Sequence, residues 1–345
     1  MDYNLLPNTD IKVSKICLGT MTFGKQNTEA EGHEQMDYAL EQGVNYFDTA
    51  ELYPVPADQY TQGATESIMG TWFKKTGRRD QIILASKVAG PGSYTKHIRK
   101  NLSFKKAHID EAVEKSLKRL QTDYIDLHPL HWPERSTNFL STRGYKHDRQ
   151  EEWVENFEAV LDALESHIKS GKIRHIGLSN ENPWGIMRFL HASKSPATKM
   201  ITVQNPYSLL NRLFEVGSAE ICHREKVGLL PYSPLAFGVL SGKYRHGKMP
   251  PNSRLALFER LVRYSGKNSF EATERYAKLA QEVGLSLTEL SLSFVNDRSF
   301  VTSNIIGATN IEQLKENIDS IHTKLSKDAL EKINGIHSKI PNPSP

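Results

Sequence analysis

Four side chains capable of proton transfer follow short apolar segments of this 345-residue sequence. Asp48 and Tyr53 come at and just beyond the end of one such segment, Lys87 ends the next, and His131 ends the one after that. If the segments are parallel strands, these residues meet at one edge of the sheet. A carboxylate keeps a neighbouring ammonium charged, and an ammonium lowers a phenol pKa from its usual value of about 10. With His131 hydrogen-bonded to a substrate oxygen, the set predicts general acid catalysis on a carbonyl by Tyr53.

Each of these residues alone has a plainer explanation. A single lysine at a strand end is often solvated, Asp48 could cap a turn, Tyr53 could pack in a loop before Pro54, and His131 could be a packed rim residue. Their occurrence at three successive strand ends favours one shared site. His128 and His131 form an H-x-x-H pair, but residues three apart on a strand point to opposite faces, so no metal site is predicted.

The chain alternates between short apolar runs and amphipathic segments, which predicts eight strand–helix units. The predicted strands are residues 16–20, 45–50, 82–88, 124–132, 173–180, 200–207, 227–235 and 304–309. The predicted helices are residues 29–42, 66–75, 109–120, 153–170, 183–191, 214–224, 270–282, 287–296, 311–321 and 327–336. Repeated βα order implies a parallel sheet, and eight units close a barrel. We therefore expect a single-domain (β/α)8 TIM barrel over residues 1–345.

The rival architecture, a Rossmann sheet, is disfavoured because no G-x-G-x-x-G follows the first strand, and no P-loop motif is present. Long loops at about residues 89–108, 133–150 and 236–268 follow predicted strands. Such loops lie at the end of a barrel where active sites form. Residues 1–15, approximately, are predicted to form a small hairpin that closes the opposite end.

The composition matches an ordinary globular protein. Lys plus Arg number 44 and Asp plus Glu number 40, and no long basic run occurs, so no nucleic-acid partner is expected. No apolar run approaches the ~20 residues of a membrane span, and the first residues lack a signal-peptide pattern. Cys17 and Cys222 are too few for a disulfide framework. We expect a cytoplasmic protein that acts on a small molecule, and the sequence does not indicate an oligomeric state.

Several stretches together resemble the aldo-keto reductase superfamily, and within it the bacterial Tas-like branch. The resemblance extends from residues 18–24 to residues 306–317, with diagnostic stretches at residues 47–53, 86–88, 130–133, 171–180 and 232–235. It implies a (β/α)8 barrel that reduces aldehydes or ketones to alcohols with NADP(H). The catalytic tetrad of the family falls on Asp48, Tyr53, Lys87 and His131.

The resemblance also implies the residues that bind the cofactor. Thr20 and Met21, with Asp48, would lie near the nicotinamide ribose. The carboxamide would be bound by Ser179, Asn180 and Gln204, and the nicotinamide ring would stack on Tyr232. The pyrophosphate would be held by Ser233, Pro234, Leu235, Phe237, Gly238, Leu240 and Lys243. The adenosine 2′-phosphate end would be formed by Arg254, Gly307, Thr309, Gln313, Glu316 and Asn317. Many members have Lys and Arg where Gly307 and Gln313 stand, so phosphate recognition is assigned to Arg254, whose planar guanidinium suits phosphate.

Three alternatives share parts of this pattern. A nicotinamide-binding regulatory or redox-sensing subunit would keep the same residues with weak catalysis. A Schiff-base aldolase would need a neutral Lys87, which Asp48 opposes. A metal-dependent hydrolase is disfavoured because the first strand has no H-x-H. The NADP(H)-dependent carbonyl reductase is the main expectation. Its natural substrate is not indicated, although Trp132 and Phe23 predict an apolar pocket.

Overall fold

The protein, described by a computed structural model over residues 1–140, 144–258 and 262–345, is an α/β structure built on eight parallel strands. The strands are β3 (Ile16–Gly19), β4 (Tyr46–Asp48), β5 (Ile83–Ala85), β6 (Ile125–Leu130), β7 (Ile173–Ser179), β8 (Met200–Gln204), β9 (Gly228–Leu229) and β10 (Asn304–Ile306). They form one sheet in the order β10-β3-β4-β5-β6-β7-β8-β9. This parallel α/β order is the one predicted from the sequence.

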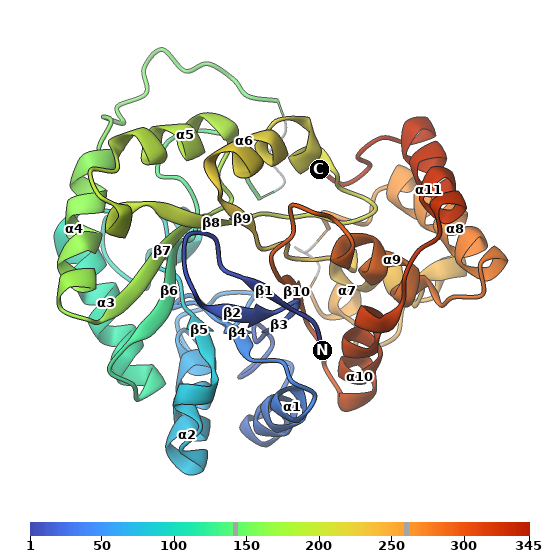
Figure 1. The fold of residues 1–345 in the computed structure, drawn as a ribbon, viewed down its shortest axis with the longest axis horizontal. Coiled ribbons are helices and arrows are strands. Elements are labelled where there is room, and N and C mark those ends of the chain that lie inside the picture. The colour runs from blue at the N-terminus through green and yellow to red at the C-terminus, as the bar shows by residue number, and fades with distance from the viewer. Residues whose placement is uncertain (141–143, 259–261) are drawn as a thin grey trace.

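Helices surround the sheet on its outer side (Figure 1). They are α1 (Glu29–Glu41), α2 (Ala64–Thr76), α3 (Lys106–Leu120), α4 (Phe157–Lys169), α5 (Pro183–Ala192), α6 (Ser218–Glu225), α7 (Arg254–Leu257), α8 (Lys267–Glu282), α9 (Leu287–Asn296), α10 (Ile311–Asp319) and α11 (Lys327–Lys339). In α3, Ile109, Ala112, Val113 and Leu117 are buried. Their spacing of three and four residues places them on one face, which explains why this helix packs against the sheet.

Backbone hydrogen bonds connect the two edges of the sheet through the residues that flank β9 and β10. The amide of Leu229 donates to the carbonyl of Phe300 (3.2 Å), and the carbonyl of Leu229 accepts from the amide of Thr302 (2.8 Å). The amide of Ile305 donates to the carbonyl of Pro231 (2.9 Å). The sheet therefore curls until β9 and the segment before β10 lie side by side.

An apolar cluster fills the inside of the curled sheet, and a hairpin lies against it. The hairpin consists of the antiparallel strands β1 (Tyr3–Leu5) and β2 (Lys12–Ser14), which cross in front of the strands in Figure 1 (dark blue). Its side chains Leu6 and Val13 are fully buried in the cluster. The other buried members of the cluster are Cys17, Tyr46, Ala85, Leu127, Ile201, Leu230 and Ile305. Leu6 and Val13 thus close one end of the sheet.

Some predicted boundaries were wrong. The predicted strand 227–235 is reduced to β9, because Pro231 and Pro234 have no N–H to continue a ladder. The predicted helix 153–170 begins at Phe157, since Trp153 belongs to the loop and packs edge-on against the ring of Phe157 (5.7 Å between centroids).

The loops at the carboxyl ends of the strands contain more regular structure than predicted. The loop after β5 ends where α3 begins at Lys106, and it includes a 3₁₀ turn at Ser93–Thr95. The stretch 236–268 includes α7 and 3₁₀ turns at Ala236–Ser241 and Arg245–Gly247. Within the predicted loops, residues 141–143 and 259–261 lie outside the described residues.

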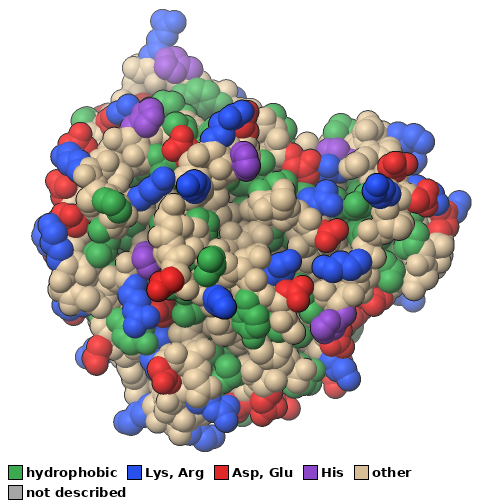
Figure 2. Space-filling model, viewed as in Figure 1, with side chains coloured by type: hydrophobic (Ala, Val, Ile, Leu, Met, Phe, Trp, Pro, Cys, Tyr) green, Lys and Arg blue, Asp and Glu red, His purple; other side chains and the backbone are tan. Residues whose placement is uncertain are grey.

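The outer surface carries charges of both signs. On the face seen in Figure 2, basic and acidic side chains are interspersed, in keeping with a net charge of +4. None of the helices in the described part of the chain is long and apolar enough to cross a membrane.

Candidate active site

A cavity of about 840 Å³ opens at the carboxyl ends of the parallel strands. Its size falls within the usual range of ligand pockets, about 300–1,000 Å³. Most of the residues that the sequence predicted for the site line it: Met21, Asp48, Tyr53, His131, Ser179, Asn180, Gln204, Tyr232, Ser233, Pro234, Leu235, Phe237, Gly238, Lys243, Arg254, Gly307, Thr309, Gln313, Glu316 and Asn317.

Three predicted residues lie behind the cavity wall. The side chain of Thr20 is fully buried, and its hydroxyl donates to the carbonyl of Asp48 (2.9 Å), so it supports the end of β4. Leu240 belongs to the hydrophobic core. Lys87 is also fully buried and reaches the cavity only through the side chains that it contacts. Thr20 and Leu240 are therefore structural neighbours of the cavity, because their side chains are used up in packing and hydrogen bonding.

Lys87 is the centre of a buried polar cluster at the base of the cavity. Two residues after Ala85, its side chain faces the inside of the sheet, because side chains alternate along a strand. Its ammonium donates to Asp48 Oδ2 (2.7 Å), to the carbonyl of Thr49 (2.7 Å) and to the hydroxyl of Tyr53 (3.4 Å). The second oxygen of Asp48 accepts from Nε2 of Gln204 (2.8 Å). Both oxygens of this carboxylate are thus engaged.

The titration behaviour of this cluster differs in part from the prediction. Burial raises the pKa of Tyr53, and the charge of Lys87 only partly opposes this rise. The expected lowering of the phenol pKa is therefore wrong for the free protein, because desolvation of a buried phenolate outweighs the nearby ammonium. Burial also acts to lower the pKa of Lys87, but Asp48 and Tyr53 outweigh it, so this pKa is raised. Tyr53 thus keeps its proton, and Lys87 stays charged, opposite to the need of a Schiff-base mechanism.

His131 faces Tyr53 across the cavity. Their ring centroids are 5.7 Å apart in an edge-on arrangement. Burial, followed by the charge of Lys87, holds the pKa of His131 well below its usual value. The imidazole is therefore neutral at physiological pH, with one ring N–H to donate. Trp132 packs against it (4.8 Å between centroids) and donates from its indole to the carbonyl of Pro91 (2.9 Å), which fixes this side of the cavity.

A second polar network follows β7 and β8. The side-chain oxygen of Asn180 accepts from the hydroxyl of Tyr232 (2.6 Å). The side-chain nitrogen of Asn180 donates to the backbone carbonyl of His131 (2.8 Å) and to the hydroxyl of Ser179 (3.1 Å). The hydroxyl of Ser179 donates to the carbonyl of Gln204 (2.9 Å). Amide and hydroxyl groups are therefore held at the cavity wall, where a ligand amide could exchange hydrogen bonds with them.

Several lining residues have a left-handed backbone. Asn180 (φ 54°), Ser233 (φ 55°) and Phe237 (φ 56°) are not glycines, and such conformations cost of order 1–3 kcal/mol each. Strain of this kind persists where the surrounding structure determines it, and it concentrates at functional sites. Here it shapes the turn after β7 and the turn that follows β9.

One part of the cavity is cationic. Lys243 and Arg254 line it, and neither forms an ion pair with a carboxylate in the described part of the chain. Arg263 also lines it, and its Nε donates to an oxygen of Pro345 (3.2 Å). The guanidinium of Arg254 lies over the ring of Phe237 (5.1 Å to its centroid). Burial lowers the pKa of Arg254, and burial together with Arg254 lowers that of Lys243. Uncompensated positive charge in a concave site favours an anionic ligand.

The turn between β10 and α10 forms the neighbouring wall. The side-chain oxygen of Gln313 accepts from the backbone N–H of Thr309 (3.1 Å). The side-chain amide of Asn317 donates to the backbone carbonyl of Gly307 (3.1 Å). Asn310 caps α10 by accepting from the amide of Gln313. These bonds hold the amino end of a helix at the cavity, where backbone N–H groups favour anions.

The model of the Aldo/keto reductase family matches residues 15–338. The chain belongs to the aldo/keto reductase family. It is 47% identical over 352 residues to Protein tas of Escherichia coli (strain K12), with both chains covered in full. It is 34% identical over 341 residues to Uncharacterized oxidoreductase YrpG of Bacillus subtilis (strain 168), covering 97% of this chain and 96% of that one. It is also 38% identical over 279 residues to Aldo-keto reductase of Babesia bovis, covering 76% and 98%. The predicted Tas-like family assignment is confirmed.

Sequence reasoning missed several residues that line the cavity of this aldo/keto reductase. Arg263 donates to the hydroxyl of Tyr232 (3.3 Å), but no feature of the sequence separates it from other surface arginines. The ring of Tyr94 lies 5.5 Å from that of Trp132 at the apolar mouth. Other apolar lining residues are Leu52, Val55, Ala57, Leu140 and Val262. The length of the loop after β5 was the one available signal, and it did not identify Tyr94.

His128 in β6 and His131 just after it lie in different environments. His131 lines the cavity, whereas His128 is fully buried away from it. Burial lowers the pKa of His128 to about 3. No group of three or more His, Cys, Asp or Glu residues in the described part of the chain is placed to hold a metal ion.

Proposed function

We propose that this protein is an NADPH-dependent oxidoreductase that reduces aldehydes or ketones to alcohols, with Tyr53 as the proton donor. The observation that carries this proposal is the contact of the Lys87 ammonium with both Asp48 and the Tyr53 hydroxyl at the base of the cavity. Membership of the aldo/keto reductase family supports it. The hydrogen bonds between the edges of the sheet support a closed (β/α)8 barrel as the scaffold.

The cavity fits a dinucleotide cofactor. Lys243 and Arg254 provide positive charge without carboxylate partners among the described residues, which suits phosphate groups. Ser179, Asn180 and Gln204 provide hydroxyl and amide groups near the base of the cavity, which suit a carboxamide. We assign the 2′-phosphate that distinguishes NADPH from NADH to Arg254. A nicotinamide bound there would supply the hydride that the reduction requires.

The residues of the protein then handle the proton. Because its pKa is raised by burial, Tyr53 holds its proton at neutral pH until a carbonyl oxygen begins to gain negative charge. Tyr53 donates that proton, and the Lys87 ammonium at 3.4 Å stabilises the phenolate that forms. Asp48 keeps Lys87 charged and in place. The neutral His131 donates a hydrogen bond to the same substrate oxygen and orients it.

The test is to measure NADPH oxidation and alcohol formation with a panel of simple aldehydes and ketones. Tyr53→Phe removes only the hydroxyl, so NADPH should bind as in the parent, while reduction should slow by about 10²–10⁴-fold. Tyr46→Phe is the matched control, because the Tyr46 hydroxyl is buried inside the sheet without a partner in the described residues. This variant should keep the parental rate.

Two results would contradict the proposal in different ways. A rate in Tyr53→Phe within a few-fold of the parent would remove Tyr53 from the chemistry. Tight NADPH binding without turnover of any carbonyl in the panel would favour the nicotinamide-binding regulatory subunit instead.

A further inference from the structure

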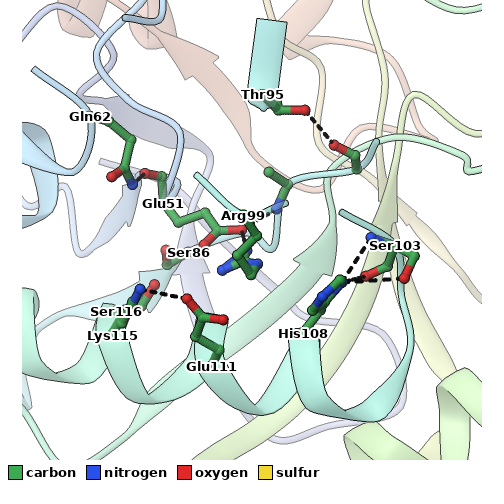
Figure 3. A network of polar contacts seen from close by, with 12 residues as sticks. Glu51, Gln62, Ser86, Thr95, Arg99, Ser103, His108, Glu111, Lys115 and Ser116 are labelled. Atoms are coloured by element: carbon green, nitrogen blue, oxygen red, sulfur yellow. Dashed lines mark hydrogen bonds and ion pairs between the residues drawn. The ribbon is translucent and has the colours of Figure 1, made fainter. Parts of the chain in front are cut away.

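A buried ion pair lies behind the Tyr53 loop and is not used by the chemistry proposed above. The side chains of Glu51 and Arg99 are 1% and 3% exposed, and Nη2 of Arg99 donates to Oε1 of Glu51. Figure 3 shows the two side chains pointing toward each other above α3. Glu51 comes from the loop after β4, and Arg99 comes from the long loop after β5.

Glu51 ties the Tyr53 loop to the chain that leaves β5. Its carboxylate accepts from the amide of Ala89 (2.6 Å) as well as from Arg99. Its own amide donates to the carbonyl of Lys87 (3.2 Å), and its carbonyl accepts from the side chain of Gln62 (2.5 Å). Main-chain and side-chain bonds of one residue therefore hold the segment that carries Lys87 beside the loop that carries Tyr53.

Tyr53 lies in the same short turn as Glu51, so the bonds of Glu51 to the segment after β5 also affect the position of Tyr53. Its amide donates to the carbonyl of Ala50 (3.0 Å), and its carbonyl accepts from the amide of Gly63 (2.9 Å), with Glu51 inside the same short turn. The Lys87–Tyr53 contact of 3.4 Å is already near the upper limit for a hydrogen bond. A small outward shift of the turn would therefore break it.

Arg99 links Glu51 to the loop after β5, which reaches the mouth of the cavity. Nε and Nη1 of its guanidinium have no acceptor in the described part of the chain, so Glu51 is the carboxylate that holds it. The loop after β5 that contains Arg99 also contains Tyr94, which lines the cavity. Buried ion pairs contribute little net stability. A positioning role explains this pair better than stability alone.

We propose that Glu51 and Arg99 are positioning residues for the proton donor. The ion pair holds the Tyr53 hydroxyl within reach of the Lys87 ammonium and anchors the loop after β5 to the same point. This inference rests on the proposed function, because it acts through Tyr53.

The first test compares Arg99→Met and Glu51→Gln with the parent, using NADPH and 4-nitrobenzaldehyde as the probe. Displacement of a reacting group by about 1 Å can cost a factor of about 10² in rate, so kcat should fall about 10- to 100-fold. The dissociation constant for NADPH should stay within about twofold, because neither side chain lines the cavity. A parental kcat in both variants would overturn the inference.

The second test places Arg99→Met in the Tyr53→Phe background. If Arg99 acts through Tyr53, its removal should change the residual rate by less than about twofold there, because interacting residues are not additive. An equal fall in both backgrounds would overturn the positioning role. A Tyr53→Phe enzyme with the parental rate would instead overturn the proposed function, and this inference with it.

Arg79→Met controls for general destabilisation. Arg79 donates to the buried carboxylate of Asp126 (2.8 Å) and to the carbonyls of Ile82 (2.7 Å) and Tyr124 (2.9 Å), at the amino ends of β5 and β6. Its loss should destabilise the protein while kcat stays within about twofold. A fall in kcat as large as that of Arg99→Met would overturn the inference. If Arg99→Met does not fold, Glu51→Gln, which preserves the side-chain shape, carries the same tests.

Discussion

Replacement of Lys87 by methionine separates the two tasks of its ammonium, which are to neutralise Asp48 and to assist Tyr53. Methionine fills a similar volume but carries no charge. Among the described residues, the variant leaves the buried carboxylate of Asp48 with the side-chain amide of Gln204 as its remaining side-chain partner (2.8 Å). Removal of one member of a buried pair typically costs about 3–5 kcal/mol, so the free energy of unfolding should fall by about that amount.

The catalytic cost follows from the 3.4 Å between the ammonium and the Tyr53 hydroxyl. At an effective dielectric constant of about 20, a charge at about this distance stabilises the phenolate by about 4 kcal/mol. Asp48, bound to the same ammonium, offsets part of this. The rate of hydride transfer should therefore fall by about 10²–10³-fold.

The double variant Lys87→Met/Asp48→Asn distinguishes the two effects. Because no lone buried charge remains, urea unfolding should show most of the lost stability restored. Single-turnover oxidation of NADPH, measured with the cofactor saturating, should remain as slow as in Lys87→Met. Recovery of the rate together with the stability would refute the reasoning, since it would mean that Lys87 acts only by keeping the protein folded.

Two further predictions concern the cofactor and the pH dependence of stability. Arg254→Ala should weaken NADPH binding by about 10- to 100-fold, the value of a charged hydrogen bond, and leave NADH binding unchanged; equal losses in a fluorescence titration would contradict the assignment. The pKa of His128 is about 3 in the folded protein, against 6.5 when unfolded, so the folded state binds fewer protons and stability falls as the pH drops below 6.5. Between about pH 7.5 and 5.5 the histidine contributes a loss of about 1.4 kcal/mol. His128→Leu should therefore lose about 1.4 kcal/mol less than the parent over this interval in urea unfolding, and an unchanged pH dependence would show that His128 does not titrate as inferred.

The fold and the base of the site were predictable because both follow from periodicity. Alternating βα segments require a parallel sheet, and polar residues at successive strand ends then share one edge. Asp48, Lys87 and His131 could be placed in this way, as could Tyr53 from its loop. The family resemblance supplied most of the remaining lining residues, and the structure places them around one cavity.

Features set by tertiary contacts were not predictable. The direction of the Tyr53 pKa depends on how far burial outweighs Lys87, and a sequence does not show burial of a loop residue. Glu51 and Arg99 lie 48 residues apart in segments without periodic pattern. Arg254 was assigned to a loop, yet it lies on the short helix α7. The sequence did not indicate this helix, because four residues are too few to give a helical repeat.

The hairpin that fills one end of the sheet has a kinetic consequence. With Leu6 and Val13 packed into the interior at one end of the sheet, the described cavity opens at the other end, where the proposed cofactor and the carbonyl compound would both enter. The cationic residues that suit the cofactor and the apolar residues near Tyr53 line this same cavity. A dinucleotide lying along it would form part of the surface on which the carbonyl compound lands. Under the proposed function, the carbonyl compound would then bind after the cofactor, and the alcohol would leave before it.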